Sequence, residues 1–189
     1  MTADRPFLGI LLMLGFCILA PLGDSIAKLL GEVMSVGAMV LIRFGAQAVF
    51  LFPFCWALRL PIPATPRLLR LIAIRTVLHI VGIGFMFTAL RYLPLADALA
   101  IAFVMPFMAL LAGWLFMGEE VGPHRLAACT VGFIGTLMVI QPNFVEVGWP
   151  ALLPLGVAVT FVAFMLVTRA MAKEVDPIAM QAVSGAMAL

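Results

Sequence analysis

The sequence predicts an all-α membrane protein, a polytopic bundle of helices that cross a lipid bilayer. Its composition is 65% hydrophobic and only 11% charged, whereas soluble domains hold about 45–50% apolar and about 25% charged residues. The apolar residues also gather in runs of roughly 20, the length of helix that crosses a hydrocarbon core of about 30 Å. A soluble globule of 189 residues has too small an interior for these side chains, so lipid must cover them.

Six apolar runs are assigned to full spans. They are Phe7–Leu30, Val36–Leu58, Leu68–Leu90, Leu95–Met117, Leu126–Ile140 and Ala151–Met171. The first run is too long for a secretory signal and has no cleavage site, so we expect a retained helix. A seventh run, Ile178–Leu189, would rise only about 18 Å as a helix. We therefore expect a truncated seventh helix and a chain that is a fragment of a longer protein.

The predicted connections are short and contain helix breakers. These are Gly31, Pro61-Ile62-Pro63, Pro94, Gly122-Pro123, Gln141-Pro142-Asn143 and Asp176-Pro177. Short connections favour antiparallel neighbours packed in one bundle.

Basic residues near the span ends predict the orientation, because cytoplasmic ends are enriched in Lys and Arg. One set of ends holds Arg5, Arg59, Arg67, Arg70, Arg125, Arg169 and Lys173, and the other holds only Lys28 and Arg91. We therefore expect a multi-pass protein of the inner (plasma) membrane with a cytoplasmic N-terminus.

A weak internal repeat links the first and sixth spans. The matched pairs are Ala27-Lys28 with Ala172-Lys173, and Ser35-x-x-Ala38-Met39 with Asp176-x-x-Ala179-Met180. Five spans separate the copies, so the second copy would enter the membrane upside down, as in many secondary transporters.

Polar residues inside the spans are the candidate site residues. They are Asp24, Lys28, Arg43, Gln47, Arg75, His79 and Asp97. Burying an Asp, Lys or Arg at a helix centre costs at least ~2.5–3.5 kcal/mol, so such residues pair, snorkel to the interface or line a polar cavity.

Depth separates these alternatives. Asp24 and Lys28 are one helical turn apart and can pair, although Lys28 can also snorkel and Arg43 can also reach Asp24. Asp97 is expected at a solvated outer mouth. His79 is close to the midplane, where a hydrogen-bonded core histidine and a functional one are equally good interpretations.

Prolines and small residues within the spans have packing interpretations as well as functional ones. Pro21 and Pro106 each remove a backbone donor, which predicts either a simple kink or a gating element. Small-residue ladders in the fourth and fifth spans predict tight helix packing or the contact face of a homodimer.

Several chemistries are not indicated. Cys17, Cys55 and Cys129 are isolated in apolar runs, which is typical of buried hydrophobes rather than of disulfides or metal ligands. No HExxH, nucleotide-binding P-loop or G-x-S-x-G sequence is present. We expect no metal, no cofactor and, with a net charge of +2, no nucleic-acid partner.

The stretch from Ala89 to Asn143 resembles the EamA-type drug/metabolite transporter superfamily. The matching features are Tyr92 in the turn after the third span, the Ala-rich run Ala96–Ala102, Pro106, Gly118-Glu119 and the run Gly132–Gly135. Glu120 departs from the pattern, because many relatives carry Arg there. The segment LGDSIAKLLGE is similar to bacterial members that transport riboflavin or other metabolites.

The resemblance implies ten helices in two inverted five-helix repeats around a central cavity. Residues 1–143 would form the first repeat and residues 144–189 the start of the second. The resemblance implies transport of a small metabolite. The deep ionisable residues and the inverted repeat predict a secondary transporter that works by alternating access, with Asp24 or His79 as the carrier of a coupled proton. A non-catalytic assembly subunit and, less favoured, a membrane-embedded enzyme stay open as alternatives.

Overall fold

The structure is a computed structural model that describes residues 6–118, 120–140 and 148–189. Every regular element in these residues is a helix, which confirms the all-α class. The elements are α1 (Pro6–Leu30), α2 (Val36–Ala57), α3 (Pro66–Tyr92), α4 (Leu95–Ala102), α5 (Met105–Met117), α6 (Pro123–Ile140), the short 3-10 turn η1 (Trp149–Ala151), α8 (Leu152–Met171) and α9 (Pro177–Met187). Each predicted span coincides with one of these elements or with an adjoining pair.

Within the described residues, four segments are long and apolar enough to cross a membrane. They are Val36–Ala57, Pro66–Tyr92, Leu95–Met117 and Trp149–Met171. Large apolar side chains cover their outer surfaces, among them Phe50 and Trp56, which are 74% and 86% exposed. Such surfaces are stable only against lipid, so this is an integral membrane protein. The total of six full spans stays a prediction.

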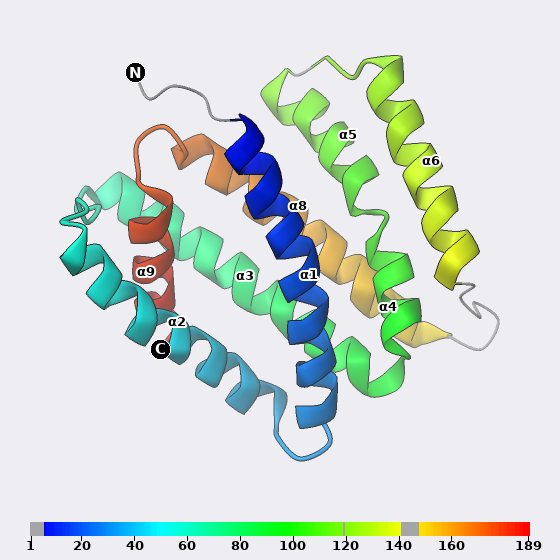
Figure 1. Cartoon of the computed structure of the whole chain (residues 1–189), viewed down its shortest axis with the longest axis horizontal. Helices are drawn as coiled ribbons and strands as arrows, with labels where there is room; N and C mark the ends of the chain where they lie inside the picture. The colour runs from blue at the N-terminus through cyan, green and yellow to red at the C-terminus, as the bar shows by residue number, and fades with distance from the viewer. Residues whose placement is uncertain (1–5, 119, 141–147) are drawn as a thin grey trace.

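Consecutive spans run in opposite directions, as the short connections predict, while α4 and α5 follow one another in the same direction within one span (Figure 1). The long helix α3 lies in the middle and packs most extensively against α8, while α2 packs against α9. The helices α4 and α5 lie along α8, and α6 lies at the far side of α5 (Figure 1).

Because the spans alternate in direction, most basic residues lie at one end of the bundle. An ion pair of 3.6 Å between Arg67, at the start of α3, and Glu174, after α8, shows that the two turns share this end. Lys28 and Arg91 lie at the opposite end, beside the turns that follow α1 and α3. The charge asymmetry therefore exists in three dimensions, and its assignment to the cytoplasm remains a prediction.

Two glycines allow α3 and α8 to approach closely. A Cβ atom on Gly82 of α3 would lie 2.9 Å from the ring of Phe161 on α8, and one on Gly156 of α8 would lie 3.0 Å from the ring of Phe85 on α3. Each helix therefore places a phenylalanine ring over a glycine of the other. Interfaces between membrane helices favour small residues for this reason.

The fourth predicted span is not a continuous helix. It is divided into α4 and α5 by a turn at Phe103 and Val104, and Pro106 is the second residue of α5. Because proline has no N–H group, the carbonyl of Ala102 loses its usual partner four residues later. Pro106 therefore coincides with a break in the helix, which is a larger change in the backbone than a simple kink.

The turns between α1 and α2 and between α8 and α9 have the same backbone structure. In each, the N–H four residues after the end of the first helix donates to the carbonyl of its last residue, over 2.8 Å and 3.2 Å. The second helix is capped in both cases by a side-chain oxygen, from Ser35 or Asp176. In this register Lys28 corresponds to Arg169 rather than to Lys173, so the turns align the second of the two predicted sequence matches but not the first. The repeat itself stays a prediction.

Candidate functional site

Arg75 is the centre of a polar cluster that joins three helices. From α3, its Nε donates to Oγ1 of Thr168 on α8 over 2.9 Å. Its two Nη atoms donate to Oγ of Ser184 and Oε1 of Gln181 on α9, each over 2.8 Å. The guanidinium carbon also lies 4.2 Å from the centre of the Phe164 ring. These contacts hold a cation that is only 4% exposed.

Among the described residues, only neutral groups accept hydrogen bonds from Arg75. Within the described residues, the single ion pair closer than 4 Å is the one between Arg67 and Glu174. A guanidinium has five N–H donors, and three bonds use only part of them. Because burial of an unpaired charge is costly, the cluster is suited to a partner that brings further acceptor atoms.

His79 lies one helical turn beyond Arg75 and is 8% exposed. Its imidazole is surrounded by three phenylalanine rings, with centroid distances of 5.2 Å to Phe44, 5.8 Å to Phe161 and 4.9 Å to Phe164. Its Nδ1 is fully buried and has no hydrogen-bond partner in the described part of the chain. A buried polar atom without a partner costs roughly 1–3 kcal/mol, so it needs a specific explanation.

Gln47 extends the cluster to α2. Its Nε2 donates to the backbone carbonyl of Gln181 over 2.7 Å. The Gln47 side chain can reach this carbonyl because Gly185 lets α9 lie close to α2. A Cβ atom on Gly185 would lie 3.1 Å from the backbone nitrogen of Ala48. The structure thus brings three of the seven candidate residues, Gln47, Arg75 and His79, into one cluster.

The candidates on the outer parts of α1 and α2 do not join the cluster through any described bond. Lys28 donates to the carbonyl of Leu93 over 2.9 Å, so it ties α1 to the end of α3. Asp24 is half-buried and Arg43 is exposed. Among the described residues, Asp24 has no ion pair within 4 Å with Lys28 or with Arg43. Neither of the pairings that the sequence allowed is formed.

Asp97 differs from its predicted environment. It lies in the first turn of α4 and is only 9% exposed, not at a solvated mouth. Its neighbours Ala98 and Ala100 are also buried, because α4 packs against α8 and α6. The nearby Arg91 is exposed and donates to the carbonyl of Met34 over 2.6 Å.

The remaining candidates, Pro21, Pro106 and Glu119, are not part of the Arg75 cluster as described. Pro21 lies inside α1, where its carbonyl accepts a 2.8 Å bond from Oγ of Ser25. Pro106 lies at the break between α4 and α5. Glu119 is outside the described residues.

Sequence reasoning missed the partners of Arg75. Thr168, Gln181 and Ser184 were not singled out, although Gln181 and Ser184 are three residues apart and share a helix face. Two polar residues on one face of a short apolar helix were the available signal. Within the described ranges, no three His, Cys, Asp or Glu side chains gather where they could hold a metal ion.

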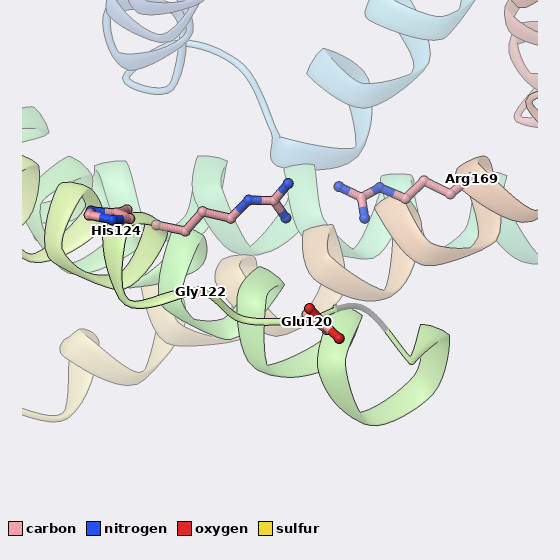
Figure 2. Close-up of a pocket in the computed structure, with 5 residues that line it drawn as sticks. Glu120, Gly122, His124 and Arg169 are labelled. Carbon is pink, nitrogen blue, oxygen red and sulfur yellow. The ribbon is translucent and has the colours of Figure 1, made fainter.

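An open hollow lies at the basic end of the bundle. It is lined by Glu120, Gly122, His124, Arg125 and Arg169. Figure 2 shows Arg169 extending from α8 toward the start of α6, where His124 lies. The hollow is separate from the Arg75 cluster, because its residues come from the helix ends rather than from the middle of α3.

Comparison with known proteins decides the family. The profile of the EamA-like transporter family matches residues 7–141. This chain belongs to the EamA-like transporter family. The match covers α1 to α6, so the cluster is built by α2 and α3 of the EamA region together with α8 and α9, which follow it.

Curated relatives of this EamA protein are named riboflavin transporters. The chain is 34% identical over 129 residues to one from Rhizobium johnstonii, a match that covers 68% of this chain and 42% of the relative. It is 28% identical over 105 residues to one from Vibrio cholerae, covering 55% of this chain and 35% of the relative. The chain thus spans less than half the length of these relatives. No solved structure matches it significantly.

Proposed function

We infer that this EamA protein is a secondary transporter that moves a small metabolite across the inner membrane by alternating access. The observation that carries this proposal is the Arg75 cluster. Arg75 and His79 lie near the middle of the 27-residue helix α3, the depth at which transporters of this kind bind substrate. Helix packing alone gives no reason to bury a guanidinium there, because apolar residues of similar volume are often at least as stable.

The proposed repeat boundary supports this mechanism. The shared turn structure of α1–α2 and α8–α9 fits a second repeat that begins near residue 144, with α8 and α9 as its first helices. The bonds of Arg75 and Gln47 then run from the first repeat to the second. Rocking of the repeats would break and remake these bonds, and it would expose the cluster to one side of the membrane at a time.

Riboflavin is the first substrate to test, because the curated relatives are named for its transport. The proposed transporter uses no cofactor and has the metabolite and the lipid bilayer as its partners. The exposed small residues Ala128 and Gly132 on α6 are where a homodimer would form. Pro106, at the break between α4 and α5, is the proposed gating element.

Uptake in cells tests the proposal. A bacterial strain that cannot make riboflavin is transformed with the gene, and uptake of labelled riboflavin and a broad metabolite panel is measured. The proposal expects uptake of at least one compound above the empty-vector strain. It expects loss of that uptake in Arg75→Ala, while Arg91→Ala, which removes an exposed arginine, keeps it. No uptake or efflux of any compound, from protein shown to be in the membrane, would favour the assembly-subunit alternative.

A further inference from the structure

The Arg75 and His79 side chains have unused hydrogen-bonding capacity that points to a particular ligand shape. Arg75 keeps N–H groups beyond its three bonds. His79 keeps a buried Nδ1 without a partner in the described residues. The two residues are one turn apart on the same face of α3, and both side chains contact Phe164, so their unused groups can serve one edge of a ligand. That edge must present acceptors to Arg75 and a donor to the neutral imidazole.

The surroundings of this edge are flat and aromatic. The guanidinium lies over the face of Phe164, and Phe44 and Phe161 meet the imidazole nearly edge-on, with interplanar angles of 86° and 89°. Edge-on ring pairs of this kind are favourable contacts. A flat ligand that stacks between these rings would replace the ring–imidazole contacts with similar ring–ligand contacts, so little interaction energy would be lost when the ligand enters.

The rings contact the imidazole directly in this structure, so a ring-shaped ligand must part them. Phe44 belongs to α2, whereas Phe161 and Phe164 belong to α8. A displacement of α2 relative to α8 therefore opens the cluster. Such a displacement is what rocking of the proposed repeats supplies, and in this respect the inference rests on the proposed function.

We propose that Arg75 and His79 together recognise the imide edge of a planar heterocycle, in which an N–H lies between two carbonyl oxygens. Arg75 donates to a carbonyl oxygen and Nδ1 of His79 accepts from the N–H, while the phenylalanine rings stack on the heterocycle. Flavins and other ring systems with a pyrimidine-dione carry this edge. A sugar-alcohol chain has no such edge, so the ring is the part that the cluster reads.

Matched probes separate the ring from its side chain. The purified chain in lipid nanodiscs is titrated with riboflavin, with lumichrome, which keeps the ring but lacks the sugar-alcohol chain, and with ribitol, which is the chain alone. Binding is followed by quenching of probe fluorescence, and ribitol is tested as a competitor. We expect riboflavin and lumichrome to bind at one shared site and ribitol not to compete.

A methylated probe tests the role of His79 directly. Riboflavin methylated on the imide nitrogen has lost the N–H, so it should bind the wild-type chain about tenfold more weakly, the effect of roughly 1.4 kcal/mol. His79→Phe keeps a ring in the cluster but removes Nδ1, and it should bind both forms equally. Arg75→Lys keeps the charge but loses the planar pair of donors, and it should weaken riboflavin and lumichrome alike. Arg91→Lys is the control.

Each outcome decides between the claims. Equal effects of imide methylation in the wild type and in His79→Phe would overturn the inference, as would competition by ribitol without binding of lumichrome. If no probe with an imide edge binds, the inference is also overturned, while transport of another metabolite stands. If the probes bind as expected but no flux occurs, the recognition site stands and the transport function fails.

Discussion

Gln181 accepts a hydrogen bond from an Nη atom of Arg75 through its side chain, and its backbone carbonyl accepts one from the amide of Gln47. One residue of α9 is thus held by two helices at once, α3 and α2. Replacing an amide by a carboxylate of equal shape should therefore have opposite effects on stability at Gln181 and at Gln47.

Gln181→Glu should stabilise the protein, because it gives the buried Arg75 the counter-charge that it lacks among the described residues. Hydrogen bonds to charged groups contribute about 1.5–3 kcal/mol, against about 1 kcal/mol for a neutral pair. Gln47→Glu should destabilise it, because a carboxylate cannot donate to the carbonyl of Gln181. Thermal unfolding in detergent measures both. Equal destabilisation by the two variants would show that Arg75 already has a counter-charge.

The stronger bond to Arg75 in the Gln181→Glu variant should also slow transport. Under the proposed mechanism this bond must break in every cycle, so a gain of about 1.4 kcal/mol in the state that contains the bond should lower the rate roughly tenfold. The rate is measured as initial uptake at saturating substrate. An unchanged rate in a stabilised Gln181→Glu variant would mean that the bond persists throughout the cycle.

The glycine at position 82 should not tolerate a methyl group. In Gly82→Ala the new Cβ would lie 2.8 Å from Oγ1 of Thr160 and 2.9 Å from the Phe161 ring, so α3 and α8 must separate. Overpacking of this kind costs about 1–3 kcal/mol. Gly84→Ala is the matched control, because nothing lies within 4 Å of its Cβ position and alanine favours helix by up to about 1 kcal/mol. Equal unfolding temperatures for the two variants would contradict the close approach.

Pro106→Ala should join α4 and α5. The new N–H can bond to the carbonyl of Ala102, which adds about 1 kcal/mol for one hydrogen bond. Hydrogen exchange at residues 103–106 should slow, and transport should slow with it if the break acts as a gate. Pro21→Ala, within the continuous helix α1, should not change exchange at residues 103–106. Slower exchange with unchanged transport would assign the break a structural role only.

The basic end of the bundle should face the cytoplasm. With Cys17, Cys55 and Cys129 replaced by alanine, single cysteines are placed at His124, beside the basic hollow, and at Glu32, in the turn after α1. Both positions are exposed. In intact cells a membrane-impermeant maleimide should label position 32 but not position 124, and permeabilised cells should label both. The reverse pattern would invert the predicted orientation.

Much of the fold follows from the sequence, because helix length and apolar content are dictated locally. The limits of α1, α2 and α8 agree with the predicted spans to within a residue or so at most ends. The break at Phe103 was not predicted, because a proline in a membrane helix is compatible with both a kink and a break. Which one occurs depends on neighbouring helices that re-satisfy the backbone.

The candidate site was predicted less completely. Depth along a span identified Arg75, His79 and Gln47, because a polar residue in the middle of an apolar helix must find a partner. The partners themselves depend on which helices touch, and that information is not local. Lys28 illustrates the limit: its nearest carboxylate in sequence is Asp24, but packing of α1 against α3 offers it the carbonyl of Leu93 instead.

Flux through purified protein tests the central claim most directly. Proteoliposomes are loaded with unlabelled riboflavin, and entry of labelled riboflavin is followed for the wild type, Arg75→Lys and the surface control Arg91→Lys. Counterflow is driven by the unlabelled substrate and needs no gradient of a coupling ion, so it reports on the translocation site. We predict accumulation by the wild type and by Arg91→Lys, and at least a tenfold slower rate for Arg75→Lys, equivalent to about 1.4 kcal/mol. Equal rates for all three proteins would contradict the claim that the Arg75 cluster is the site of transport.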